Sequence, residues 1–337
     1  MKRVLSIILV FALTIVMFAS CKKNENITYS GSVMLYTTIS EEAVADLKLS
    51  FEKEYPGVVL DYYYGDIDRV SRKIDTEYES GQMNADVVFL SDVLYIDDMK
   101  NNSRLEAYES KEARKIPKEY KDSENYYFAG AVTTMGLAFN KNPEFGIDEK
   151  SLPKTYNDFL NNDFNGKMAL ADPRSDSYVK FWVMAMMQNK NYGDVFFRRL
   201  RDYGIVIRPS ERDVLDNIVG AVYSFGLCYD ENSVNFTKEF EDFGFNYLTT
   251  DNVTMPTSVA LVKDSVNPVN GKLLIDYILS KKGQDVLIKN GFIPARTDAK
   301  NVLDSKSVIS KSIKVDIEDL KIKGNDYITL FRDIFGD

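Results

Sequence analysis

The sequence predicts an α/β protein built from two doubly wound lobes, and three observations support this. Short runs rich in β-branched and aromatic residues alternate with amphipathic stretches of helical period, a pattern typical of parallel sheets covered by helices. The hydrophobic fraction of 45% is close to the globular average, which argues against wholesale disorder. The length of 337 residues is enough for two units of roughly 150 residues each.

Three strand and helix units open the first lobe. We expect strands at residues 33–37, 58–64 and 85–90, with a helix that starts at Ser40 after the first and a helix over residues 67–78 after the second. Ligands of doubly wound sheets lie beyond the carboxyl ends of the strands. This rule places three stretches on one rim, namely Tyr36 to Ser40, Gly65 with Asp66, and Ser91 with Asp92.

The alternation resumes after residue 166 and predicts a second α/β lobe. Its expected strands cover residues 167–171, 205–207 and 219–226, and its expected helices start near Ser177, Tyr192 and Ser210. Ser210 followed by Asp213 resembles a capping box. Beyond this lobe we expect a strand at 258–263, helices over 270–290 broken at Gly283, and solvated packing helices over 317–335.

Composition excludes several classes of function. Without any histidine, the chain cannot build a Ser-His-Asp or Cys-His nucleophile, an HExxH metalloprotease or an imidazole-ligated metal site. A net charge of −9 and a pI near 4.9 exclude a nucleic acid as the expected partner. The GxxxxGK[ST] phosphate loop is also missing, so any ATP hydrolysis must belong to another chain.

The first 20 residues have the pattern of a signal peptide. Lys2 and Arg3 precede the apolar run 4–18, and Ala19, Ser20 and Cys21 follow it. This ending resembles a bacterial lipobox, so we expect Cys21 to become the lipidated N-terminus and residues 21–30 to form a tether to the membrane. The alternative is a plain secretory signal with an incidental cysteine.

Several strings in a fixed order resemble the type II periplasmic solute-binding proteins, specifically the ferric-iron-binding family, which also contains phosphonate and sugar-phosphate binders. The resemblance covers residues 33–300 and rests on Tyr36-Thr37 before the Ser40 helix, Ala85 to Asp92, LEAYES at 105–110, IPKEY at 116–120, residues 166–173, and KKGQDVLIKN at 281–290.

The resemblance implies two lobes joined by a two-segment hinge. The expected N-lobe comprises residues 31–135 plus 256–337, and the expected C-lobe comprises residues 136–255. It also implies an extracytoplasmic, non-enzymatic monomer that captures a small solute by lobe closure. The solute would then pass to the permease and ATPase of an ABC importer.

Ferric iron is the first expected solute. The resemblance places its ligands at Tyr36, Asp92, Tyr178 and Tyr223, with or without a synergistic anion, and phenolate and carboxylate oxygens suit this hard cation. The sequence departs from the family pattern in two places: Tyr223-Ser224-Phe225 replaces two consecutive tyrosines, and no histidine stands beside Ser40. The structural alternative is that the tyrosines pack in the core and that Asp92 caps a helix.

An oxyanion such as an aminoalkyl phosphonate or a sugar phosphate is the alternative solute. Ser175, Ser177 and the amides of their helix could cradle a phosphate, and Arg174 could add a bidentate contact, although Asp176 opposes this with its negative charge. A purely structural surface lipoprotein, stabilised by no solute, is a further alternative. The residues expected to contact an anion or to support the metal ligands are Ser40, Asp66, Ser91, Thr133, Thr134, Arg174, Ser175, Asp176 and Ser177.

Overall fold

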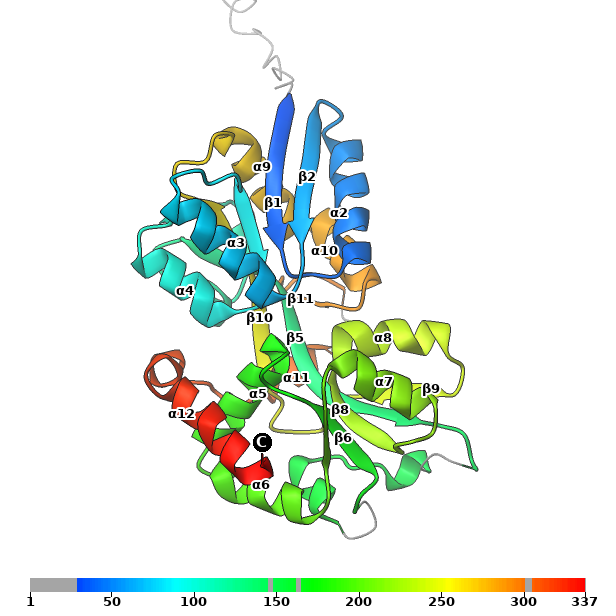
Figure 1. Ribbon diagram of the computed structural model, residues 1–337. Coiled ribbons are helices and arrows are strands. Elements are labelled where there is room, and N and C mark those ends of the chain that lie inside the picture. The colour runs from blue at the N-terminus through cyan, green and yellow to red at the C-terminus, as the bar shows by residue number, and fades with distance from the viewer. Residues whose placement is uncertain (1–28, 145–147, 162–164, 301–304, 337) are drawn as a thin grey trace, which may run out of the picture.

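A computed structural model describes residues 29–144, 148–161, 165–300 and 305–336. The chain forms two lobes, one above the other, and the strands β5 (Tyr127–Asn140) and β10 (Thr254–Val262) connect them (Figure 1). The expected signal peptide, Cys21 and most of the expected tether lie outside the described residues. In the described part of the chain, no helix combines the length and apolar character that crossing a bilayer requires.

The upper lobe contains a mixed sheet with helices on both faces. Its strands run in the order β2, β1, β3, β10 and β5, where β1 is parallel to β2 and β3, and β10 is antiparallel to β3 and β5. The sequence predicted the three parallel strands from short runs rich in apolar and aromatic residues. The elements are β1 (Gly31–Thr37), α2 (Glu41–Glu54), β2 (Val58–Tyr64), α3 (Ile67–Glu79), β3 (Val87–Leu90), α4 (Val93–Asn101), β4 (Leu105–Glu106), α9 (Pro268–Leu279), α10 (Lys281–Lys289) and β11 (Ile293–Pro294).

The lower lobe repeats this arrangement around a smaller sheet. Strand β8 lies between β5 and β6, it is antiparallel to β5 and parallel to β6, and β7 closes the edge. Trp182 is fully buried in its core and donates to the Tyr156 hydroxyl at 2.9 Å. The elements are β6 (Met168–Ala171), α5 (Ser177–Gln188), α6 (Gly193–Asp202), β7 (Val206–Arg208), α7 (Glu211–Val219), β8 (Phe225–Tyr229), α8 (Asp230–Glu239) and β9 (Phe243–Asn246).

Strand β5 belongs to both lobes. Its residues up to Thr134 pair with β10, and from Met135 onward it pairs with β8. A single extended strand therefore carries the chain from one core to the other, which makes this position a natural hinge.

Two predicted elements have different bounds in the structure. The strand expected at 219–226 lies at 225–229, because α7 continues to Val219 and the chain then turns at Ala221, where φ is +59°. The helix break expected at Gly283 lies at Ser280, whose hydroxyl accepts from the Gly283 N–H at 3.2 Å and caps α10.

The C-terminal helix requires a correction of the expected lobe division. Helix α12 (Ile317–Phe335) was expected in the upper lobe as a solvated helix, but it packs against α5 and α6 of the lower lobe (Figure 1). The Phe331 ring meets Phe197 at 5.5 Å, and Leu320 and Ile334 are buried in the same core. The apolar stripe of this helix explains the packing, because burial of these side chains on the lower lobe removes them from water.

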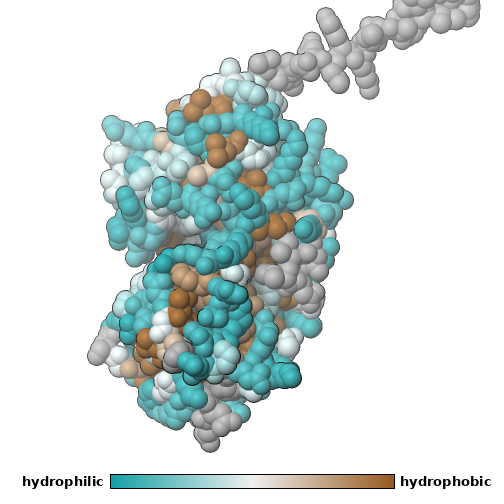
Figure 2. Space-filling model, turned by 90° about the vertical axis from the view of Figure 1, so that its right-hand side faces the viewer, coloured by the Kyte–Doolittle hydropathy of each residue, from teal (hydrophilic) through white to brown (hydrophobic). Residues whose placement is uncertain are grey.

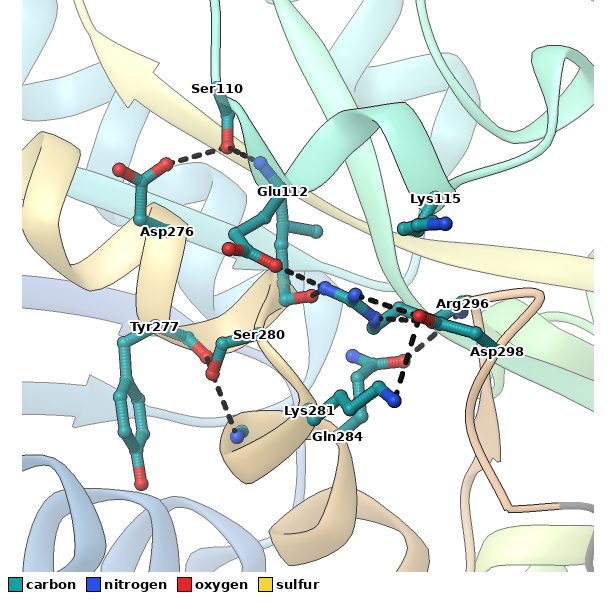
Figure 3. A network of polar contacts seen from close by, with 12 residues as sticks. Ser110, Glu112, Lys115, Asp276, Tyr277, Ser280, Lys281, Gln284, Arg296 and Asp298 are labelled. Carbon is teal, nitrogen blue, oxygen red and sulfur yellow. Dashed lines mark hydrogen bonds and ion pairs between the residues drawn. The ribbon is translucent and has the colours of Figure 1, made fainter.

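The chain leaves the upper lobe through a network centred on Arg296 (Figure 3). Arg296 is 7% exposed, and its guanidinium pairs with Glu112 and Asp298 and donates to the Leu279 carbonyl at 2.9 Å. The Gln284 amide oxygen accepts from the Ala295 N–H at 2.8 Å. These contacts fix residues 295–298 on the upper lobe, and α11 (Ser305–Ser310) and α12 then follow toward the lower lobe.

Candidate functional site

The carboxyl ends of strands from both lobes face one another across the hinge. The space-filling view shows a hollow between the two halves of the molecule, at the left edge of the picture (Figure 2). Two contacts bridge the lobes there: the Ser91 and Ser177 hydroxyls are 3.1 Å apart, and the Ser40 N–H donates to Glu231 Oε1 at 3.4 Å. The lobes are therefore closed on one another in this structure.

Hydroxyl groups form the upper side of this cleft. The Thr38 hydroxyl donates to Ser91 Oγ at 3.0 Å and accepts from the Ser91 N–H at 2.8 Å. Ser40 is the N-cap of α2, but its hydroxyl makes no capping bond and faces Glu231 across the gap. Ser40 and Ser91 each lie shortly after the end of a parallel strand, which is why the sequence predicted both of them on the rim.

Two tyrosines form part of the lower side. The Tyr178 and Tyr229 rings are 4.6 Å apart at centroid distance. The Tyr178 hydroxyl lies 3.1 Å from Thr257 Oγ1 on the hinge strand β10, and the Tyr229 hydroxyl accepts from Asn232 Nδ2 at 3.1 Å. Burial raises the pKa of both phenols, so both are neutral without a bound cation.

Four carboxyl groups surround these tyrosines: Glu211, Asp230 and Glu231 are buried, and Asp176 is half-buried. Burial is the main cause that raises the pKa of each group, and for Glu231 it raises the pKa to about 7. Among the described residues, no lysine or arginine forms an ion pair with any of these four groups. The lower side of the cleft thus concentrates acidic groups without a cation to balance them.

Backbone and amide donors hold these carboxyl groups in place. Glu211 accepts from the Tyr229 N–H at 2.6 Å and from Asn232 Nδ2 at 2.7 Å. Asp230 accepts from the Tyr247 hydroxyl at 3.1 Å. The donors are neutral, so they orient the carboxyl groups but supply no opposite charge.

The structure does not bring the four expected metal ligands together. Tyr36 points into the helix layer of the upper lobe, where its hydroxyl donates to Glu77 at 2.7 Å. Asp92 Oδ1 caps α4 by accepting from the N–H groups of residues 94 and 95 at 2.9 and 3.0 Å. Tyr223 precedes β8, at the opposite end of that strand from Tyr229, so of the four only Tyr178 lines the cleft wall.

The described residues contain no group of three or more Asp, Glu or Cys side chains arranged to hold a metal ion.

The expected phosphate cradle at the start of α5 is already occupied. Asp176 Oδ1 accepts from the Tyr178 and Val179 N–H groups at 2.9 and 3.1 Å, which fills the helix N-terminus. Arg174 pairs with Asp172, and the Ser175 hydroxyl donates to the Pro209 carbonyl at 2.6 Å.

The other predicted contact residues are divided between the cleft and the framework. Asp66 caps α3 by accepting from the Arg69 N–H at 2.8 Å. Thr134 donates from its hydroxyl to the Val253 carbonyl at 2.9 Å, whereas the buried Thr133 hydroxyl faces Tyr178. Ser40, Ser91 and Ser177 lie at the contacts between the lobes.

The sequence analysis missed Glu211, Tyr229, Asp230 and Glu231. The strand that ends at Tyr229 was predicted at 219–226, so its carboxyl end was expected near Gly226. For that reason Tyr223, and not Tyr229, was predicted as a ligand. Residues Phe225 to Tyr229 are themselves a short apolar run followed by two acids. The change from apolar to acidic residues after Tyr229 was the signal from which the end of this strand could have been predicted.

Comparisons with known proteins agree with this architecture of two hinged lobes that face each other across a cleft. Such an arrangement defines a class of proteins that enclose a small solute. Residues 33–293 match the family described as bacterial extracellular solute-binding protein. The chain belongs to this family, which confirms the prediction of a solute-binding transport protein rather than an enzyme.

Solved structures with the same fold come from proteins with different solutes. Iron-bound HitA from Pseudomonas aeruginosa superposes with a TM-score of 0.75 at 17% identity, over 90% of this chain and 99% of that one. AfuA from Actinobacillus pleuropneumoniae, with fructose-6-phosphate bound, has a TM-score of 0.74 at 19% identity, over 91% and 99% of the two chains. At these identities the similarity shows the fold.

A curated relative is the phosphoglycerate transport regulatory protein PgtC of Salmonella typhimurium, 24% identical over 277 residues. The match covers 80% of this chain and 66% of the relative, so this chain spans slightly less than two thirds of that protein's length.

Proposed function

We propose that the chain captures ferric iron in the cleft between its lobes and delivers it to the permease of an ABC importer. The observation that carries this proposal is the lower side of the cleft, where four carboxyl groups, three of them buried, and two tyrosines meet without a basic partner. A cation bound there would replace protons and relieve the cost of the buried acids.

Ferric iron suits this set of oxygen atoms better than a softer or less charged ion does. It prefers anionic oxygen, and a bound cation stabilises the deprotonated form of a phenol that would otherwise stay neutral. We infer that Tyr178 and Tyr229 supply phenolates and that Asp176 and Glu231 supply carboxylates. The similarity to iron-bound HitA supports this choice of solute.

An aminoalkyl phosphonate is the second candidate. Hydroxyl groups at Thr38, Ser91 and Ser177 could bind the phosphonate, while its ammonium group would lie among the carboxylates. The similarity to the fructose-6-phosphate complex of AfuA and to PgtC supports an oxyanion group in the solute. A purely anionic solute is less favourable, because Asp92 and Asp176 already occupy the helix N-termini that would attract it.

Titration of the iron-free protein with ferric citrate tests the proposal. Iron bound through phenolate gives a visible charge-transfer band, and we expect Tyr229→Phe and Tyr178→Phe each to weaken or shift this band. Tyr223→Phe is the matched control and should leave it unchanged. A protein that stays colourless and iron-indifferent, but is stabilised against heat by 2-aminoethylphosphonate, would support the second candidate.

The location at the membrane belongs to the same proposal. We propose lipidation at Cys21, a tether up to residue 30, a monomeric state, and a separate ATPase chain that drives transport. Replacement of Cys21 by Ala should release the protein from the membrane fraction. If the variant is retained as well as the wild type, the lipid anchor is wrong.

A further inference from the structure

A second cavity lies beside the hinge, apart from the solute cleft. Its volume is about 970 Å³, within the range of small-molecule sites. The upper lobe contributes Tyr120 and Pro294 to its wall, β10 contributes Pro256, and the lower lobe and C-terminal helix contribute Phe181 and Ile317.

The hinge strand separates this cavity from the cleft. Thr254 and Pro256 of β10 line the cavity, whereas the Thr257 hydroxyl meets Tyr178 on the cleft side at 3.1 Å. Alternate residues of a strand point to opposite faces of the sheet, so the two sites lie on opposite faces of one strand.

The lining combines an apolar interior with an excess of positive charge. Apolar walls come mainly from Phe181, Ile309, Ile313 and Val315. Among the described lining residues, the basic ones are Lys121, Arg296, Lys300, Lys306 and Lys314, and Glu119 is the single acid. Lys306 is already engaged in a polar contact, so Lys300 and Lys314 carry the argument on charge. The charge of Arg296 is balanced by Glu112 and Asp298 (Figure 3), and the Lys121 ammonium donates to the Ala113 carbonyl at 3.0 Å.

This chemistry is complementary to an amphipathic organic anion. A hydrocarbon chain would be removed from water by the apolar walls, and its acidic head group would be attracted by the lysines. We propose that the hinge cavity binds a small amphipathic carboxylate, and that this ligand favours the closed arrangement of the lobes.

Binding in this cavity is linked to lobe closure because both lobes contribute to the cavity wall. The cavity has this shape while the Ser91 and Ser177 hydroxyls are in contact and the cleft is closed. A ligand that touches both lobes in this arrangement binds it more tightly than any arrangement in which the walls separate. The ligand therefore shifts the population of protein molecules toward the closed form.

Calorimetric titration of the whole, iron-free protein with decanoate tests the site. We expect saturable binding at one site and at least tenfold weaker binding of decanol, which lacks the charge. The double variant Lys300→Glu, Lys314→Glu should weaken decanoate at least tenfold. The matched control is Lys190→Glu, Lys263→Glu, which changes the net charge equally on exposed lysines elsewhere and should bind like the wild type.

A second variant tests the volume of the cavity. Ile309→Trp places a large ring in the space, and Ile309 is only half-buried, so the fold should tolerate the change. We expect this variant to lose decanoate binding and to keep the wild-type far-ultraviolet circular dichroism. Equal decanoate affinity in the wild type, Ile309→Trp and the lysine double variant would overturn the proposed site.

Small-angle X-ray scattering tests the coupling to closure. Saturating decanoate should reduce the radius of gyration of the iron-free wild type and leave that of Ile309→Trp unchanged. Binding without any compaction would overturn the coupling. These measurements use no iron, so their failure leaves the proposed iron function untouched, and failure of iron binding leaves them intact.

Discussion

Glu231 combines burial, a position between the lobes and a pKa close to neutrality. It follows β8 in the lower lobe and accepts from the Ser40 N–H of the upper lobe. Burial raises its pKa from 4.5 to about 7. The folded protein therefore holds this proton at pH values where an unfolded chain has released it.

This difference predicts a loss of stability as the pH rises. Below pH 4.5 the carboxyl group is protonated in both states, so it imposes no penalty. Between pH 4.5 and 7 the unfolded chain ionises first, and the free energy of unfolding falls by about 3 kcal/mol from this group alone. Asp176, Glu211 and Asp230 act in the same direction, because burial raises the pKa of each.

Urea unfolding of the iron-free protein at pH 5 and pH 7.5 measures this effect. We expect the loss between the two pH values to be about 3 kcal/mol smaller in Glu231→Gln than in the wild type. Glu109→Gln, at an exposed glutamate, should show the wild-type loss. Equal losses in all three proteins would contradict a buried, protonated Glu231.

At the residue scale, the sequence predicted only some of the side chains that lie at the cleft. Ser40, Ser91 and Ser177 could be predicted, because they follow strand ends in a doubly wound fold. Tyr36 also lies near a strand end, but strands alternate sides, and its side chain points to the helix layer and Glu77. The direction of a side chain depends on register and packing, which a rule on strand ends does not supply.

Two acidic residues near the cleft, Asp92 and Asp176, are the N-caps of helices. Asp92 and Asp176 each accept two N–H bonds from the first turn of the helix that follows. Such a cap satisfies backbone donors that would otherwise lack a partner. The sequence left both readings open for Asp92, since a carboxylate before a helix suits either role.

Substitution of Asp92 separates the cap from a solute contact. Asp92→Ala should lower the free energy of unfolding by about 1 kcal/mol, because it removes the cap. Asp92→Asn should cost much less, since asparagine also caps helices, and should leave the affinity for ferric citrate unchanged. If Asp92→Asn is as stable as the wild type but loses iron, Asp92 contacts the solute.

The predicted boundaries of helices and strands were accurate where the local sequence pattern was clear. Strand β2 occupies 58–64 as predicted, because its apolar and aromatic run ends at Gly65. Strand β8 was predicted six residues too early at its start, 219 instead of 225, because the end of α7 is as apolar as a strand. The packing of α12 on the lower lobe could not be predicted, since its apolar stripe fits either lobe.

At the scale of the whole molecule, closure brings the backbone of the two lobes into contact at Gly291. This residue follows α10 in the upper lobe with a φ of +97°, and an added Cβ would lie 2.6 Å from the Glu231 carbonyl oxygen of the lower lobe. A side chain is not accommodated at that distance. Gly291 is therefore a position where the smallest residue allows the lobes to meet.

Gly291→Ala should consequently act as a wedge between the lobes. Gly81 provides the matched control, because its φ of +67° imposes a similar backbone cost on alanine, but a Cβ there meets nothing within 4 Å. We expect Gly291→Ala to increase the radius of gyration in scattering and to weaken ferric citrate binding at least tenfold, while Gly81→Ala binds like the wild type. Because both variants carry the strain of a positive φ, equal binding by the two would mean that the contact between Gly291 and Glu231 does not control closure.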